Sequence, residues 1–477
     1  MSLIDNASSS LLRLLLVGAA LAAPGCAAST EDSAPVVAEA DLSASDDAVA
    51  ALASTAKGHL YVSLTARTGP VATSALIAAA KRGVTVRAIL DAGGSFDATW
   101  TMQQHLESSG VDVDVRTDVV SDVLAVSDDA ALLPGATPRT EKDATKVKGF
   151  EKRFTDILEW THGDQKAGLI APGAVAVHPM PESGRDRIVQ LISAAKTSID
   201  LSIYQLQDRP VVDALIAAAG RHVKVRVMLE PRTVGAANFD AVSASLNAGG
   251  VTVKNTPKAF DSSHNVDHAK FCLIDDKELL FGTGNMVRSG LGGVDVTAFD
   301  NRDFWIEDAR PAALKEARAL FDADLAETST SHMTFDALVV TPDNANGKIG
   351  ALIDSAKHRL FVANQSLSDV GIQGKILAAK KRGVDVRVLL GYQPPFGGGA
   401  PPNEPALKAL TAGGVKASYL KKHYLHAKII VADDAVYLGS QNFTNGGLNN
   451  NREVGEILTD AKAVSTVVDT FTKDSTN

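Results

Sequence analysis

The sequence predicts an α/β protein built from repeated modules, each a mostly parallel sheet flanked by helices. Three segments share one pattern, in which an amphipathic helix is followed by a tight turn and an alternating Val-x-Val-Arg strand: PVATSALIAAAKRGVTVRAILD from Pro70, PVVDALIAAAGRHVKVRVMLE from Pro210 and GIQGKILAAKKRGVDVRVLLG from Gly371. An apolar strand precedes each of them. Because strand, helix and strand follow in that order, we expect right-handed crossovers between parallel strands.

The three repeats lie far apart, so each belongs to a whole domain and not to a stacked solenoid unit. A chain of 477 residues is also too long for one ordinary core. We therefore expect an N-terminal module at residues 51–165, module 1 at residues 166–330 and module 2 at residues 331–477. Modules 1 and 2 are expected to pack together as a pseudo-dimer within a monomer.

Residues 1–26 are predicted to be an export signal, because Arg13 precedes the short apolar run LLLVGAALAA and small residues follow. The run is too short to anchor the chain across a bilayer. Ala23-Pro24-Gly25-Cys26 resembles a bacterial lipoprotein cleavage box, with Cys26 as the lipidated residue, and the alternative is an ordinary signal peptide. Residues 27–50 are expected to be a flexible linker. We expect a protein that is secreted or held in the periplasm, the outer membrane or the cell surface.

Charge and cysteine content narrow the range of functions. The net charge is -9 and only 5% of the residues are aromatic, which argues against a protein that coats nucleic acid. The second cysteine, Cys272, lies in an apolar strand-like run, so no internal disulfide is expected. We expect Cys272 to be a small buried hydrophobic residue.

Two stretches near the end of modules 1 and 2 carry the same chemistry-bearing pattern. They read HNVDHAKFCLIDDKELLFGTGNM and HYLHAKIIVADDAVYLGSQNFT. Both contain His-x-Lys-x4-Asp, formed by His268, Lys270 and Asp275 in module 1 and by His426, Lys428 and Asp433 in module 2. The two aspartates fall at strand ends, where we expect them to tie loops together without touching a substrate.

In module 2, alternation along a strand places His426 and Lys428 on the same face. A neutral imidazole there can attack phosphorus, and the lysine can neutralise a phosphoryl oxygen. Ser440 and Asn442 can add hydrogen bonds to the same oxygens. The histidine also needs a partner on its other ring nitrogen, and Glu453 is the candidate.

Module 1 repeats this arrangement, with Thr283 and Asn285 as the hydrogen-bonding residues for substrate and Asp303 as the orienting carboxylate for His268. Displacement at phosphorus needs a nucleophile on one side and a proton donor to the leaving oxygen on the other. Symmetric packing of the two modules would place one histidine on each side of the phosphorus, so we expect one shared site.

The N-terminal module lacks this chemistry. Its segment SDVLAVSDDAALLPG places Asp128 where module 2 has Asp433, but Ser121 and Val123 stand in the positions of the histidine and the lysine. We interpret it as a degenerate copy of the same fold. The alternative is an unrelated α/β domain with generic similarity.

Over residues 180–475 the helix-turn-strand units and the paired motifs resemble the phospholipase D superfamily. The resemblance implies a site in which one histidine becomes a covalent phosphohistidine and the other acts as acid and then base, without metal or cofactor. It implies His268 as the nucleophile. It also implies phosphate contacts from the lysines and asparagines, with Thr283 and Ser440 at the small hydroxyl position.

We therefore expect an enzyme that hydrolyses phospholipids to phosphatidic acid and a free head group at a membrane surface. Three alternatives remain: a secreted nuclease, a phosphatidyltransferase of the cardiolipin synthase kind, and a non-catalytic surface-binding protein. The acidic charge and the low aromatic content make nucleic acid the less favoured partner.

Overall fold

The computed structural model describes residues 39–65, 67–91, 96–116, 124–134, 137–158, 168–231, 237–260, 265–292, 299–394 and 399–476. Cys26, Ser121 and Val123 lie outside these residues. From Ala40 onward the three modules pack as one unit. No helix among the described residues is both long enough and apolar enough to cross a membrane.

The N-terminal module forms a six-stranded sheet in the order β3-β2-β1-β4-β5-β6. Helix α1 begins at Glu39, so the prediction of a flexible linker is wrong for residues 39–50. The elements are α1 (Glu39–Thr55), β1 (His59–Leu64), α2 (Pro70–Lys81), β2 (Thr85–Asp91), α3 (Phe96–Glu107), β3 (Asp112–Arg116), β4 (Ala125–Ser127), β5 (Ala131–Leu133), β6 (Arg139–Glu141) and α4 (Ala144–Leu158).

Module 1 forms a sheet in the order β10-β9-β8-β11-β12-β13, and β7 pairs with β13. Its elements are β7 (Val175–Met180), α5 (Asp186–Ala194), β8 (Ser198–Ile203), α6 (Arg209–Gly220), β9 (Lys224–Leu229), α7 (Ala237–Ala248), β10 (Thr252–Asn255), a 3₁₀ turn (Lys258–Phe260), β11 (Lys270–Ile274), β12 (Glu278–Gly282), α8 (Arg288–Leu291), β13 (Asn301–Asp308) and α9 (Pro311–Leu325).

Module 2 forms a sheet in the order β17-β16-β15-β19-β20-β21-β14. Its elements are β14 (Leu338–Thr341), α10 (Ala345–Ser355), β15 (Arg359–Asn364), α11 (Val370–Lys381), β16 (Asp385–Leu390), α12 (Glu404–Ala412), β17 (Lys416–Tyr419), β18 (Tyr424–Leu425), β19 (Lys428–Ala432), β20 (Ala435–Gly439), a π-helical turn (Gly446–Asn450), β21 (Glu453–Leu458) and α13 (Ala461–Ser475).

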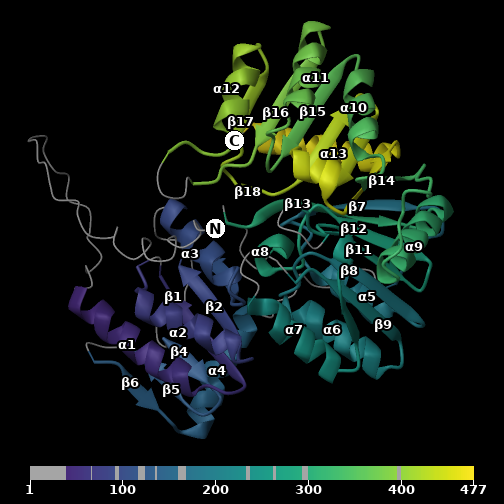
Figure 1. The fold of residues 1–477 in the computed structure, drawn as a ribbon. Helices are drawn as coiled ribbons and strands as arrows, with labels where there is room; N and C mark the ends of the chain where they lie inside the picture. Colours follow the sequence, from purple (N-terminus) through teal and green to yellow (C-terminus); the bar gives the residue numbers. More distant parts are fainter. Residues whose placement is uncertain are drawn as a thin grey trace, which may run out of the picture. The chain divides into compact units, whose positions relative to one another are not determined.

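The three sheets follow the same path, which confirms the repeat (Figure 1). In each, three parallel strands joined by helices continue into antiparallel strands, such as β8 pairing with β11 and β15 with β19. The sheets are therefore mixed, and the prediction of mostly parallel sheets is wrong. Each motif strand runs antiparallel to the first parallel strand of its module, and a tight hairpin then joins it to a further antiparallel neighbour, β12 or β20.

Aspartates close the same loop in all three modules. Asp128 accepts hydrogen bonds from the backbone N–H groups of Lys57, Gly58 and His59. Asp275 and Asp433 accept equivalent bonds from residues 196–198 and 357–359. The match at Asp128 supports the interpretation of the N-terminal module as a third copy of the fold.

Modules 1 and 2 share a hydrophobic core, which makes them a pseudo-dimer. Alternate residues of a strand face opposite sides of the sheet. In β11, Phe271 and Leu273 therefore face the shared core, whereas Cys272 and Ile274 belong to the separate core of module 1. Cys272 is buried and unpaired, as expected. Helices α9 and α13 complete the shared core, and Figure 1 shows α13 beside β7 of module 1.

Candidate active site

The two histidine segments meet where the modules exchange backbone hydrogen bonds. The N–H of His268 donates to the carbonyl of Arg452 at 2.8 Å, and the N–H of Ala427 donates to the carbonyl of Arg302 at 2.8 Å. Strand β18 consists of the two residues directly before His426, and it pairs with β13 of module 1. Each histidine is therefore held against the last strand of the other module.

This exchange decides which carboxylate meets which histidine. His268 Nδ1 lies 2.8 Å from Glu453 Oε2, and His426 Nδ1 lies 3.0 Å from Asp303 Oδ1. The prediction that Asp303 orients His268 and Glu453 orients His426 is therefore wrong. Each carboxylate lies in the first residues of a strand, β13 or β21, that runs beside the other module's histidine segment. The two carboxylates do hold the two histidines, but across the pseudo-dimer.

An arginine precedes each of these carboxylates and fixes the same contact. Arg302 Nε lies 2.6 Å from Asp474 in α13, and its Nη2 lies 2.8 Å from Glu182. Arg452 repeats the arrangement with two aspartates, Asp324 in α9 and Asp343, each at 3.0 Å. We call these two sets of arginine–carboxylate contacts the arginine clasps. Sequence reasoning missed them, although the Asn-Arg pair that comes directly before both carboxylates was the available signal.

The two motif lysines are fully buried beside the histidines. Each ammonium group donates to the backbone carbonyl of its own motif histidine, and Lys428 Nζ also lies 3.3 Å from the carbonyl of Thr283. Burial lowers the pKa of Lys428 to about 8, while Asp303 and Glu453 oppose that shift. Burial also lowers the pKa of Lys270.

The two hydroxyl residues, Thr283 and Ser440, and the two asparagines, Asn285 and Asn442, differ in their position relative to the cavity. Thr283 Oγ1 donates to Asp303 Oδ1 at 2.6 Å, and Ser440 Oγ accepts from the N–H of Val454 at 3.0 Å. Both hydroxyl residues are fully buried and neither lines the cavity, so the prediction that they bind substrate is wrong. Their side chains face the neighbouring strand, β13 or β21, and Thr283 helps to position Asp303.

Asn285 and Asn442 do line the cavity. The Oδ1 atom of each is buried without a hydrogen-bond partner among the described residues. Asn285 Nδ2 donates to Gln205 Oε1 at 3.1 Å. By contrast, Asp275 and Asp433 lie in the loop closures already described, away from the cavity lining.

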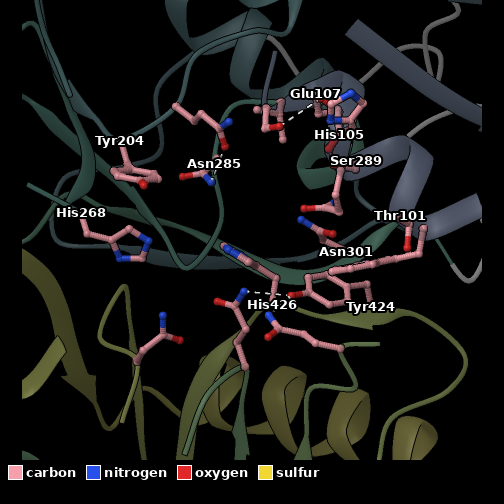
Figure 2. Close-up of a pocket in the computed structure, with 18 residues that line it drawn as sticks. Thr101, His105, Glu107, Tyr204, His268, Asn285, Ser289, Asn301, Tyr424 and His426 are labelled. Carbon is pink, nitrogen blue, oxygen red and sulfur yellow. Dashed lines mark hydrogen bonds between the residues drawn. The ribbon is translucent and has the colours of Figure 1, made fainter. Parts of the chain in front are cut away.

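A single cavity of about 590 Å³ contains both histidines. Figure 2 shows His268 and His426 directed into the same space, with Tyr204 beside His268. The lining comprises Trp100, Thr101, Gln104, His105, Glu107, Ser108, Tyr204, Gln205, His268, Asn285, Val287, Ser289, Asn301, Gln365, Gln393, Tyr424, His426 and Asn442.

Sequence reasoning missed Tyr204, Gln365 and Tyr424. For Tyr204 and Gln365 the available signal was their position in the sequence. Each directly follows the carboxyl end of a central parallel strand, which is where α/β sheets usually bind ligands. The Tyr204 ring packs edge-on against the His268 imidazole, with 4.8 Å between ring centroids. The residues of α3 carried no such signal.

Both imidazoles are set up to be neutral at neutral pH. Burial lowers the pKa of His268 to about 4, although Glu453 opposes the shift. Burial likewise lowers the pKa of His426 against the effect of Asp303. The carboxylates accept from Nδ1–H, which leaves Nε2 of each ring as the nitrogen available for chemistry.

A family model described as "Cardiolipin synthase, PLD-like domain" matches residues 188–325 and 349–475. The chain belongs to the phospholipase D superfamily. The two matched ranges fall in modules 1 and 2 and include both histidines, both lysines and both crossed carboxylates.

Known relatives carry several activities. A polyphosphate kinase of Yersinia pestis is 27% identical over 297 residues, which cover 57% of this chain and 40% of that protein. A polyphosphate kinase of Escherichia coli strain K12 is 25% identical over 289 residues, with the same coverage. This chain thus spans less than half the length of these relatives. The crystal structure of a phosphatidylserine synthase from Haemophilus influenzae aligns with a TM-score of 0.50 and 14% identity, covering 69% of this chain and 89% of that one.

Proposed function

We propose that this protein hydrolyses phosphodiester bonds through a covalent phosphohistidine, and that phospholipids are its substrates. The observation that supports the proposal is the pair of carboxylate-held histidines in one cavity, each contributed by a different module. Export of the protein is also part of the proposal, as the sequence of the first 26 residues suggests.

In the first step, the Nε2 lone pair of neutral His268 attacks phosphorus and forms an N–P bond. The bond from phosphorus to the alcohol oxygen breaks, and His426 donates its Nε2 proton to that oxygen. An anionic phosphodiester between the rings raises the pKa of His426, because negative charge stabilises an imidazolium ion. Asp303 holds the ring throughout.

In the second step, neutral His426 takes a proton from water, and the water oxygen attacks phosphorus as the N–P bond breaks. The products are a phosphomonoester and an alcohol, and both histidines return to their starting states. Lys270 and Lys428 do not line the cavity, but they lie buried beside the two histidines, and their positive charge offsets the negative charge of the phosphoryl oxygens. The amides of Asn285 and Asn442 can donate hydrogen bonds to the same oxygens.

The cavity lining favours a diester with one negative charge over a polyanion. Among the described residues that line the cavity there is no lysine or arginine. The whole chain carries a net charge of -9. Polyphosphate and nucleic acid are usually bound by rows of basic side chains. We therefore do not propose polyphosphate, named in the polyphosphate kinase relatives, as the substrate of this cavity.

Turnover of simple diesters by the purified protein tests the proposal. The substrates are bis(p-nitrophenyl) phosphate and short-chain phospholipids, with plasmid nicking and polyphosphate consumption measured beside them. We expect hydrolysis of both diester types, and loss of that hydrolysis in His268→Ala and in His426→Ala. Near-normal turnover in either variant would contradict a shared site. Activity on plasmid or polyphosphate alone would contradict the substrate class.

A further inference from the structure

The N-terminal module, which has no histidine-lysine motif among its described residues, packs against the edge of the active-site cavity. Arg288 Nη2 lies 2.7 Å from Asp114 Oδ2, and Gln207 Nε2 donates to the carbonyl of Glu107 at 2.8 Å. Ser289 Oγ donates to the Glu107 carboxylate at 3.2 Å. These contacts fix β3, through Asp114, and the carboxyl end of α3, through Glu107, against module 1.

Helix α3 then forms one wall of the cavity. Trp100, Thr101, Gln104 and His105 line it on successive turns. The Trp100 ring packs against the Tyr424 ring of module 2, with centroids 5.6 Å apart. Figure 2 shows Thr101 and His105 on the far side of the cavity from His268.

Several side chains on this side are neutral amides or hydroxyls. Gln104 and Asn301 line the cavity, as does Tyr424, whose Oη accepts from Gln365 Nε2 at 3.1 Å and from Gln393 Nε2 at 2.6 Å. A phenol oxygen that accepts two hydrogen bonds keeps its own hydrogen to donate.

Glu107, the one carboxyl group among the described lining residues, does not add a negative charge at neutral pH. Burial raises the pKa of Glu107 to about 8, against the effect of its hydrogen bonds with Ser289 and Gln103. Among the residues that the structure describes, the wall therefore offers neither a fixed anion to pair with an ammonium group nor a lysine or arginine to pair with a second phosphate.

We propose that α3, together with Asn301 and Tyr424, binds the alcohol part of the phosphodiester, and that this alcohol is uncharged and carries hydroxyl groups. The inference rests on the proposed function, because the phosphate must lie between the two histidines for the alcohol to reach α3. Amides and hydroxyls can both donate to and accept from alcohol hydroxyls, and aromatic faces pack against their C–H groups. The N-terminal module is thus a specificity element for a reaction whose chemistry lies in the other two modules.

The test compares three substrates in the full-length protein. They are a short-chain phospholipid with a glycerol head group, the matching phospholipid with a choline head group, and bis(p-nitrophenyl) phosphate. The variant is Thr101→Ala combined with Gln104→Ala, since Thr101 is exposed and Gln104 is only partly buried, so their truncation spares the core. The matched control is Thr145→Ala, an exposed threonine in α4 of the same module.

We expect the wild-type protein to prefer the glycerol diester over the choline diester. The double variant is expected to lower kcat/KM for the glycerol diester on the order of tenfold more than for bis(p-nitrophenyl) phosphate, the effect of losing two neutral hydrogen bonds. Thr145→Ala should leave all three values unchanged. An equal loss on all substrates, no loss at all, or a wild-type preference for choline would overturn the inference while leaving the hydrolytic chemistry intact. Absence of turnover on every diester would instead overturn the proposed function.

Discussion

His268 Nδ1 and Glu453 Oε2 lie 2.8 Å apart, although the two residues are 185 positions apart in the chain and belong to different modules. The pseudo-symmetric pair, His426 and Asp303, repeats the contact in the opposite direction. Neither module therefore holds a complete histidine–carboxylate pair by itself, and the site exists only when modules 1 and 2 are packed together.

Replacing Glu453 with Gln tests this crossed arrangement. The amide keeps the shape of the side chain but no longer offers two accepting oxygens, so it does not enforce the Nδ1–H tautomer of His268. We expect kcat to fall by roughly 10²–10⁴-fold, the range attributed to positioned acid–base groups. The measurement is steady-state hydrolysis of bis(p-nitrophenyl) phosphate. Glu327→Gln, at an exposed position, is the matched control, and an equal effect of the two variants would refute the role of Glu453.

The alkaline side of the pH profile is predicted to report Lys428. Burial holds the pKa of this lysine at about 8, so it loses its charge as the pH rises through that value. Because the neutral amine no longer offsets a phosphoryl oxygen, kcat/KM should decline above about pH 8, and this parameter follows ionisations of the free enzyme. Lys428→Arg keeps the charge at all these pH values. In this variant kcat/KM should no longer decline above about pH 8, even if the reaction is slower overall. If the same decline persists, it arises from the ionisation of another group.

The motif aspartates are predicted to stabilise the fold without taking part in the reaction. Asp433 accepts three backbone N–H groups at a residue with φ 50°, whereas the next residue, Asp434, is fully exposed. Asparagine also tolerates this left-handed conformation, so Asp433→Asn changes the charge and not the backbone. We expect a loss of about 1–3 kcal/mol in the free energy of unfolding, measured by urea denaturation. Asp434→Asn should change nothing, and a large loss of kcat in folded Asp433→Asn would contradict this assignment.

The sequence was sufficient to predict the repeats, the paired motifs and the sharing of one site, because helix and strand periodicities and the spacing of His268, Lys270 and Asp275 are local properties. The crossed pairing was not predictable in this way. It depends on β18 leaving its own sheet to pair with β13, a tertiary choice that no local pattern in Tyr424 and Leu425 reveals. The wrong prediction for Thr283 has a related cause. Alternation along a strand assigns side chains to two faces of the sheet, but it does not show which face lines a cavity.

The arginine clasps are predicted to join modules 1 and 2. Arg302 and Asp474 are both almost fully buried, so Arg302→Met leaves a buried carboxylate without its partner. We expect a loss of about 3–5 kcal/mol in the free energy of unfolding, the usual cost of breaking a buried ion pair. Arg209→Met, which removes an exposed ion pair with Asp213, should cost at most about 1 kcal/mol. Urea denaturation of both variants checks this, and similar midpoints would contradict it.

The most direct measurement traps the covalent intermediate in the His426→Asn variant. With bis(p-nitrophenyl) phosphate the leaving group needs no acid, so His268 can still attack, but no histidine remains to activate water for the second step. The account predicts a burst of one p-nitrophenol per protein molecule. Peptide mass mapping after denaturation at alkaline pH, where the N–P bond of phosphohistidine survives, should find the phosphorylated adduct on the peptide that contains His268. Continued turnover without any adduct, or an adduct absent from that peptide, would contradict the two-histidine mechanism across modules 1 and 2.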